Sequence, residues 1–352
     1  MTINVGLVGC GRIAVRHADL VGGGQIPGMR LQAVCDVQAD RAEKFGRKYG
    51  VPTYSSMTQM MEAEPVNLAV VLTPSGMHAD HVVALARFGK DVMTEKPMAL
   101  RLDDASRMIR ACEEARVRLF VVKQNRFNVP VLKLREALEQ GRFGKLFLGT
   151  VRVRWSRTQA YYDQDAWRGT WRYDGGVLAN QASHHIDLLE WMMGDITSLY
   201  AKSINAFAQT ETEDTAVAVV KFSNGALGTI EATTAVRPKD LEGSISILGS
   251  GGSVEIGGFA VNRLRVWQFS DAREGDEDTL AKFSVNPPDV YGFGHRAYYH
   301  HVADCIENGA AQLVDGREGM KSLRVLTAMY ESIETGREIT LHFQPEKCRL
   351  GT

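Results

Sequence analysis

The chain has 352 residues, of which 44% are hydrophobic and 24% are charged, and its formal net charge is −1. This balance excludes predominant disorder and is typical of a globular protein of about two domains. The near-zero charge offers no basic excess for nucleic-acid binding, and no apolar run approaches the roughly 20 residues that span a membrane.

The N-terminus leads directly into a strand-like segment, so we expect no signal peptide. Five widely spaced cysteines without a Cys-x-x-Cys pair favour neither a disulfide framework nor a zinc site, and they fit a reducing cytoplasm.

Short apolar runs alternate with amphipathic segments in the first third of the chain. Strands are predicted at 3–8, 31–35, 66–73, 91–95 and 118–122. Between them, helices are predicted up to about Leu20 and at 39–49, 77–88 and 102–115. The run at 66–73 is apolar almost throughout, which is typical of parallel strands that helices cover on both faces. The alternation predicts an α/β Rossmann domain with a doubly wound parallel sheet over residues 1–123.

Beyond residue 123 the pattern changes to that of an α+β domain, which we assign to 124–352. Helices are predicted at 130–140, 183–193, 293–307 and 316–335. Strands are predicted at 146–157, 198–208, 214–222, 225–236, 243–249, 253–257, 260–269 and 279–285, with a polar, aromatic loop over 158–175. Asn-Gly and glycine-rich turns between the short strands favour one open, mostly antiparallel sheet. The last helices are candidates for packing back on the first domain.

The first chemical motif is the glycine-rich turn Gly9-Cys10-Gly11-Arg12-Ile13-Ala14, which follows the first strand and opens the first helix. Gly9 allows a tight turn, Gly11 lets the backbone approach a pyrophosphate, and Ala14 lets helix and strand pack closely. Asp36 ends the next strand, where an acid accepts hydrogen bonds from a ribose 2′-hydroxyl and repels a 2′-phosphate. The motif predicts dinucleotide binding with NAD preferred over NADP; the alternative is a glycine turn in some other α/β domain.

The second motif, Thr94-Glu95-Lys96-Pro97, follows a strand at the carboxyl edge of the sheet, where open α/β folds bind ligands. A lysine there can hold a substrate hydroxyl and stabilise negative charge that develops on its oxygen. Pro97 is a candidate for a cis bond that aims Lys96. The alternative is an ordinary Glu–Lys pair on a solvated loop.

The third motif runs from Gly175-Gly176 to Leu189 and contains Asn180, His184 and Asp187 at spacings of four and three. These spacings place the three side chains on one helical face. Histidine is the natural general base near neutral pH, although a lone helical histidine is more often a packed core residue. The adjacent His184-His185 pair does not favour a metal site, because neighbours on a helix diverge by about 100°.

Together these motifs resemble the Gfo/Idh/MocA oxidoreductase family, named for glucose–fructose oxidoreductase and inositol dehydrogenase, over nearly the whole chain. The resemblance also includes Thr73-Pro74-Ser75 with His78 and the segment 89–97. The family segment G-x-L-x-D-x-G-x-H-x-x-D aligns its catalytic histidine with His184 rather than His185. Its aspartate falls on Asn180, which keeps a hydrogen bond but carries no charge, so the pair Lys96 and His184 is left to carry the chemistry.

A narrower resemblance is to bacterial UDP-N-acetylglucosaminuronate 3-dehydrogenases. It is carried by segments 123–128, 161–162, 167–171 and 174–184. The resemblance implies oxidation of the C3 hydroxyl of a UDP-linked N-acetyl-aminouronic sugar by a tightly held NAD. It also implies a place in the synthesis of surface-polysaccharide sugars and 2-oxoglutarate as a possible oxidant of NADH.

The resemblance assigns a role to individual residues of this sequence. His184 is the implied acceptor of the hydroxyl proton and Lys96 the implied stabiliser of the alkoxide. The implied cofactor-binding residues are Gly9, Gly11, Arg12, Ile13, Asp36, Arg41, Thr73, Pro74, Ser75, His78, Glu95, Lys96, Gln124, Trp167 and Arg168. The implied substrate contacts are Lys96, Arg157, Tyr161, Asn180 and His184, and no metal is expected.

Several of these assignments have a plainer alternative. The alternative for Trp167-Arg168 is a surface aromatic turn. Arg126, Arg157 and Tyr161 suit either the charges of a nucleotide sugar or an ordinary solvated surface.

Two other functions fit the same sequence: an inositol-dehydrogenase-like enzyme acting on another sugar or cyclitol, and a cofactor-sensing binding protein without turnover. A sensor needs neither Lys96 nor His184, so their presence favours an enzyme. Members of the family commonly pair the faces of their open sheets, and one face of this sheet is predicted to expose Val, Leu and Ile. A homodimer or homotetramer is therefore expected.

Overall fold

The computed structural model describes residues 2–284 and 292–352 and divides into two compact units. The first unit comprises Met1–Val122 and His295–Met320, and the second comprises Lys123–Gly294 and Lys321–Thr352. Each unit has its own sheet and its own buried core. Within the described residues, no helix has the length and apolar composition that a membrane crossing requires.

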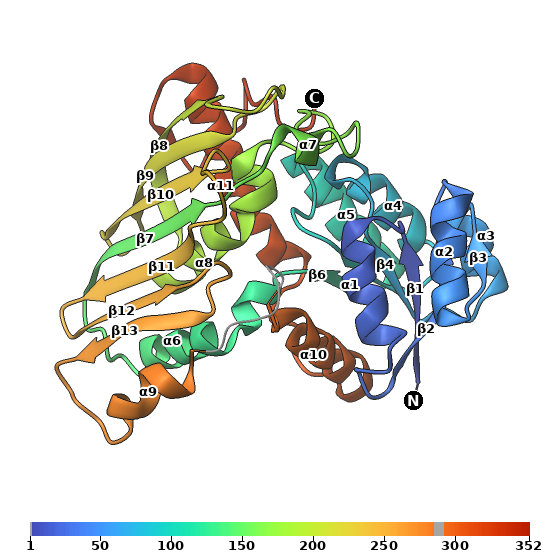
Figure 1. Cartoon of the computed structure of the whole chain (residues 1–352), viewed down its shortest axis with the longest axis horizontal. Helices are drawn as coiled ribbons and strands as arrows, with labels where there is room; N and C mark the ends of the chain where they lie inside the picture. The colour runs from blue at the N-terminus through green and yellow to red at the C-terminus, as the bar shows by residue number, and fades with distance from the viewer. Residues whose placement is uncertain (1, 285–291) are drawn as a thin grey trace. The chain divides into compact units, whose positions relative to one another are not determined.

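The first unit is built on six parallel strands in the order β3-β2-β1-β4-β5-β6. The strands are β1 Ile3–Val8, β2 Met29–Cys35, β3 Thr53–Tyr54, β4 Leu68–Val71, β5 Asp91–Thr94 and β6 Leu119–Val121. Helices α1 Arg12–Val21, α2 Ala39–Tyr49, α3 Met57–Ala63, α4 His78–Ala86 and α5 Leu102–Ala115 connect them. The order reverses at β1, and ligands of such sheets bind at the carboxyl ends of the strands beside this point. The predicted Rossmann architecture is confirmed (Figure 1).

The second unit contains an eight-stranded sheet in the order β13-β12-β11-β7-β10-β9-β8-β14. Its strands are β7 Leu146–Arg154, β8 Ile196–Ile204, β9 Thr215–Phe222, β10 Leu227–Thr233, β11 Glu242–Gly249, β12 Gly252–Gly257, β13 Arg263–Phe269 and β14 Ile339–Thr340. Only β7 and β10 pair in parallel, so the predicted mostly antiparallel sheet is confirmed. The helix α8 (Ser183–Met193) packs against β7 and β11, and α6 (Val129–Glu139) packs against β12.

Burial alternates along β9, which shows that the sheet has one covered and one open face. Ala218 and Val220 are buried, whereas Val217 and Val219 are 52% and 58% exposed. Neighbouring Leu227 is also exposed. An open apolar face on an antiparallel sheet commonly marks a contact surface.

Residues 279–285 were predicted to form a strand, and this prediction is wrong for the described residues. The helix α9 (Asp276–Lys282) occupies most of the segment, and residue 285 lies outside the described ranges. Asp276 anchors the helix start by accepting hydrogen bonds from Arg142 and Trp267, at 2.6 and 2.7 Å. Arg142 lies 134 positions away in the sequence, so a local pattern does not reveal this contact.

Two of the remaining helices, α10 and α11, lie where helices were predicted, and the short helices and turns among the remaining elements were not predicted. The remaining elements are η1 Ser75–Met77, η2 Gln124–Phe127, α7 Gln159–Tyr162, the π-helical turn η3 Val177–Gln181, α10 Gly294–Asn308 and α11 Gly316–Thr335. All of α10 except Gly294 belongs to the first unit, and α11 begins in the first unit and ends in the second.

Candidate functional site

The glycine turn after β1 has the geometry needed for a bound phosphate. Gly9 has a φ of +100°, and a Cβ there would lie 2.9 Å from the backbone of Leu72. Gly11 precedes the first residue of α1, and a Cβ there would meet no described atom within 4 Å. There is therefore room beside Gly11, directly before the N-terminal N–H groups of α1, where the helix dipole favours an anion. Ala14 is fully buried, which allows α1 to pack closely.

Asp36 lies directly beside this turn at the end of β2. Its Oδ2 accepts a hydrogen bond from Cys10 N at 2.7 Å, and its Oδ1 accepts one from Gln38 N at 2.8 Å. These bonds fix the carboxylate, and each oxygen keeps a lone pair for a ribose hydroxyl. The fit to a dinucleotide is therefore good at both the phosphate and the ribose ends. The other predicted contacts on these helices are less buried: Arg12 is exposed, and Ile13 and Arg41 are half-buried.

The loop after β4 carries Thr73, Pro74 and Ser75 and is tied to the loop after β5 by His78. The imidazole nitrogens of His78 lie 2.8 Å from the Thr73 carbonyl oxygen and 2.9 Å from that of Pro97. Burial lowers the pKa of His78. Its ring is 1% exposed, so this residue, predicted beside the cofactor, is placed to support two loops from inside.

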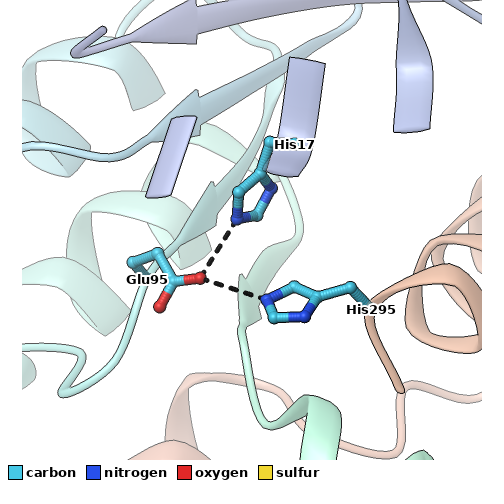
Figure 2. Close-up of side chains that lie close together, drawn as sticks. All are labelled: His17, Glu95 and His295. Carbon is cyan, nitrogen blue, oxygen red and sulfur yellow. Dashed lines mark hydrogen bonds and ion pairs between the residues drawn. The ribbon is translucent and has the colours of Figure 1, made fainter. Parts of the chain in front are cut away.

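Glu95 and Lys96 follow β5 and point to different environments. The Lys96–Pro97 bond is cis, as predicted. The side chain of Lys96 is half-buried, whereas Glu95 is buried with its Oε1 3.1 Å from His17 Nε2 and 3.7 Å from His295 Nε2 (Figure 2). Glu95 was predicted to bind the cofactor, and the structure instead places its carboxylate among these two histidines.

His184 lies on the first turn of α8 in the second unit, next to Gln124. The Nε2 atoms of the two side chains are 2.9 Å apart. Gln124 Oε1 is buried and has no hydrogen-bond partner among the described residues. Turning the amide over would let this oxygen accept from a His184 Nε2–H, because the two orientations of a glutamine amide are assigned from the hydrogen-bond network. Gln124, predicted to contact the cofactor, thus orients the histidine ring in either arrangement.

His185 occupies a quite different environment from His184. It is fully buried, and its ring makes a T-shaped contact with Trp155 at 5.8 Å between centroids. Burial lowers the pKa of His185 to about 3. A group this acidic when protonated is a poor proton acceptor at neutral pH, which favours His184 as the base.

One turn along α8, Asp187 holds the helix by a buried ion pair. Arg126 donates to both carboxylate oxygens at 2.8 Å, and Lys123 Nζ lies 3.5 Å from Oδ1. Burial alone would raise the pKa of Asp187, but the charges of Arg126 and Lys123 hold it at about 2. Arg126 was a candidate for binding substrate charges, and its 2% exposure shows a packing role instead.

Asn180 lies in the π-helical turn before α8 and donates a hydrogen bond to Asp174. Asp174 is buried and accepts a second hydrogen bond from Gly169 N at 2.7 Å. A carboxylate therefore supports Asn180, although Asn180 itself carries no charge. The sequence contains Asp174 just before the glycine pair, but nothing in that spacing indicated its partner.

Sequence reasoning also missed Glu213, which holds the start of the same π-helical turn. Its Oε1 accepts hydrogen bonds from Leu178 N at 3.0 Å and from the Tyr330 hydroxyl at 2.9 Å. A Cβ on Gly176 would lie 2.1 Å from Glu213 Oε2, so only glycine fits there. Glu213 Oε2 has no hydrogen-bond partner in the described part of the chain, and burial raises the pKa of Glu213 to about 7.

An arginine–aromatic cluster forms in the loop 158–175 and the adjoining end of β7. Arg168 Nη1 donates to the Tyr161 hydroxyl at 2.9 Å, and its guanidinium lies 4.7 Å from the ring centroids of both Tyr161 and Trp167. Arg157 donates to Asp240 at 3.0 Å and lies 5.5 Å from the Tyr161 ring. The structure thus brings together four residues that the sequence assigned to cofactor or substrate.

Comparisons with known proteins agree with this architecture. The family model described as "Oxidoreductase family, NAD-binding Rossmann fold" matches residues 3–123, and the one described as "Oxidoreductase family, C-terminal alpha/beta domain" matches 135–341. The chain is 42% identical to the WlbA dehydrogenase from Bordetella pertussis, whose crystal structure is in complex with NADH and UDP-GlcNAcA. That match has a TM-score of 0.93 and covers 97% of this chain and 99% of the other.

Two further relatives are similar over almost the whole chain. The WlbA dehydrogenase from Chromobacterium violaceum, also in complex with NADH and UDP-GlcNAcA, is 40% identical with a TM-score of 0.92, and 97% of each chain is covered. Myo-inositol 2-dehydrogenase from Thermotoga maritima is 29% identical, with 96% of this chain and 98% of the relative covered.

We predict that His184→Ala lowers turnover by about 10²- to 10⁴-fold, the usual contribution of a positioned general base. His185→Ala removes a packed ring, so it should lower the melting temperature. At a temperature where the variant is folded, its turnover should fall much less than that of His184→Ala. Both are measured by NADH absorbance at 340 nm and by thermal unfolding. Equal, small effects on turnover at the two positions would show that His184 is not the base.

We predict that Glu213→Gln changes the pH dependence of stability. Because the folded state raises the pKa of Glu213 from 4.5 to about 7, folding retains a proton that the unfolded chain releases. This carboxyl therefore lowers the free energy of unfolding as pH rises from 4.5 to 7, by at most about 3 kcal/mol. Urea denaturation at pH 5 and pH 8 should show a smaller pH-dependent loss in the variant, and parallel curves would contradict the assignment.

Proposed function

The chain belongs to the Gfo/Idh/MocA oxidoreductase family, and the relatives described above are sugar and cyclitol dehydrogenases; from this premise we propose its substrate. We infer that it oxidises the C3 hydroxyl of a UDP-linked N-acetyl-aminouronic sugar to the 3-keto sugar. The observation that carries this proposal is the 42% identity, over 97% of this chain, to a dehydrogenase bound to NADH and UDP-GlcNAcA.

The two candidate catalytic side chains suit this oxidation. His184 takes the proton of the reacting hydroxyl, and Gln124 fixes its ring for that step. The Lys96 ammonium stabilises the negative charge that develops on the oxygen. NAD, when bound, supplies the acceptor for the hydride that leaves the same carbon. The losses of one proton and one hydride convert the alcohol to the ketone.

Binding roles follow from the local contacts of each unit. The glycine turn and Asp36 hold the pyrophosphate and ribose of NAD. Asn180, held by Asp174, is proposed to bind a sugar hydroxyl. Arg157 forms an ion pair with Asp240, and Arg168 forms one with Asp165. Because a guanidinium has five N–H donors, each arginine keeps donors for an anionic substrate.

The wider setting is also part of the proposal. The enzyme would serve the synthesis of surface-polysaccharide sugars, with 2-oxoglutarate reoxidising NADH. A reducing cytoplasm suits the five cysteines, none of which forms a disulfide in the described structure. The exposed side chains of Val217, Val219 and Leu227 on the open sheet face support a homodimer or homotetramer through that face.

The test is NADH formation at 340 nm with NAD and UDP-GlcNAcA, and separately with NAD and myo-inositol. The proposal expects reduction only with the nucleotide sugar. It then expects loss of the NADH absorbance and formation of 2-hydroxyglutarate when 2-oxoglutarate is added. Turnover of myo-inositol alone would favour the inositol dehydrogenase, the second candidate, which the Thermotoga maritima relative supports. Binding of NAD without turnover of either compound would favour a cofactor-sensing protein.

We predict that Lys96→Met, which keeps the apolar stem and removes the charge, lowers turnover by about 10²- to 10³-fold, as for the loss of one preorganised donor. NAD affinity should change little, because the glycine turn and Asp36 make most of the proposed cofactor contacts. Fluorescence titration of NADH and steady-state turnover on the same preparation separate the two effects. A parallel loss of affinity and turnover would make Lys96 a cofactor residue.

A further inference from the structure

A buried carboxylate cluster lies inside the first unit, directly behind Lys96. Glu95 is 6% exposed, and Figure 2 shows its carboxylate with Oε1 facing both His17 and His295. His17 comes from α1 and His295 from α10, so the cluster joins the segment after β5 to two helices that are distant in sequence. The second nitrogen of His17, Nδ1, lies 2.7 Å from the hydroxyl of Tyr299, one turn after His295.

The other oxygen of the same carboxylate is bound to the backbone of Lys96. Glu95 Oε2 accepts the Lys96 N–H at 3.0 Å. The main chain of Glu95 is itself fixed, because its N–H donates to the Val71 carbonyl oxygen at 3.1 Å and so extends the β4–β5 pairing. The Glu95 carboxylate therefore fixes the peptide group between Glu95 and Lys96. The orientation of this carboxylate is in turn set by the histidines on α1 and α10.

The electrostatics of the cluster make this carboxylate an anion. Burial alone would raise the pKa of Glu95, but His17 and His295 hold it well below its usual range. A buried anion is costly unless hydrogen bonds satisfy it, so both oxygens must keep their donors. A neutral amide in its place carries no charge and has only one acceptor oxygen, so it cannot accept at both ends of the group, from the Lys96 N–H and from a histidine N–H, as the carboxylate does.

The three side chains also have the composition of a metal site, since their ligand atoms all lie within 4.8 Å of one another. Two histidines and one carboxylate are a familiar zinc-ligand set. However, 3.1 Å between Glu95 Oε1 and His17 Nε2 is an ordinary hydrogen-bond length. The bond from Lys96 N to Oε2 further shows that the carboxylate is engaged with backbone. The geometry therefore favours hydrogen bonding, and metal content becomes an outcome of the test.

We propose that Glu95, oriented by His17 and His295, is a positioning residue that holds Lys96 in place for the oxidation. This inference deepens the proposed function and rests on it, because Lys96 matters only if it stabilises the developing alkoxide. Glu95 does not itself touch the reacting atoms in this account. It acts through the backbone of its neighbour, and Tyr299 contributes indirectly by holding His17.

The first experiment is a double-mutant cycle between Glu95→Gln and Lys96→Met. Glu95→Gln alone should lower kcat by about 10- to 100-fold, as for the loss of one hydrogen bond to a buried charge. KM for NAD should change by less than about twofold. In the Lys96→Met background the same change should have almost no further effect, because residues that act as one unit are non-additive. Losses that multiply would overturn the proposal.

A matched control comes from the same helix. His301 lies on α10 and accepts from Leu313 N at 3.0 Å, but it does not contact Glu95 in the structure. His301→Asn should leave kcat and KM unchanged, whereas Tyr299→Phe should lower kcat modestly in the same direction as Glu95→Gln. If His301→Asn and Glu95→Gln lowered kcat alike, the cluster would be merely structural.

A second readout needs no substrate and so separates this inference from the proposed function. Hydrogen exchange of the Lys96 amide, followed by mass spectrometry on a peptide that contains it, should be about tenfold faster or more in Glu95→Gln and unchanged in His301→Asn. An unchanged exchange rate would overturn the positioning role even if the nucleotide sugar proves to be the wrong substrate. A parallel loss of NAD affinity in Glu95→Gln would identify Glu95 as a cofactor contact. One equivalent of zinc in the purified protein would identify a metal site. Either result would overturn the positioning role of Glu95.

Discussion

A carboxylate that is wholly or partly removed from water must find hydrogen-bond donors, and this constraint shapes several of the segments that carry a candidate functional side chain. Asp36 binds the backbone beside the glycine turn, and Glu95 binds the backbone of Lys96. In the second unit, Asp187 anchors α8, Asp174 holds Asn180, and Glu213 holds the turn before α8. Because each acid has its donors on a particular segment, satisfying the acid also fixes that segment.

The same degree of burial has opposite consequences for two of these acids. Asp187 meets two cations and titrates at about 2, so it is an anion throughout the neutral range. Glu213 accepts hydrogen bonds from a backbone N–H and a tyrosine hydroxyl, and burial raises its pKa to about 7. The helix that carries His184 is therefore held by a permanent ion pair at Asp187, and the turn before it is held by a group whose pKa lies near neutrality.

Local chemistry made parts of the structure predictable. The helices Ala39–Tyr49, Leu102–Ala115 and Ser183–Met193 have the predicted bounds, because the residue pattern of each helix is continuous in the sequence. The glycine turn and Asp36 were likewise visible, since their roles depend on short spacings. The partners of Glu95 were not predictable from the sequence. His17 and His295 are 278 positions apart, and only the folded chain brings them together. The contact between Glu213 and Tyr330 was not predicted for the same reason, because the two residues are 117 positions apart.

The adjacent histidines are both buried, and their neighbours give the two identical side chains different properties. His185 packs against Trp155, and burial has lowered its pKa to about 3. His184 instead meets the polar amide of Gln124.

The charge of the substrate separates the two candidate substrate classes. A cyclitol carries no charge and has no need of arginine, whereas a nucleotide sugar acid brings a diphosphate and a carboxylate. Arg157 and Arg168 flank the same tyrosine ring, and each gives only part of its donor capacity to an acid of the protein. Planar guanidinium groups held against aromatic rings are pre-organised to bind such anions, so this cluster favours the nucleotide sugar over the cyclitol.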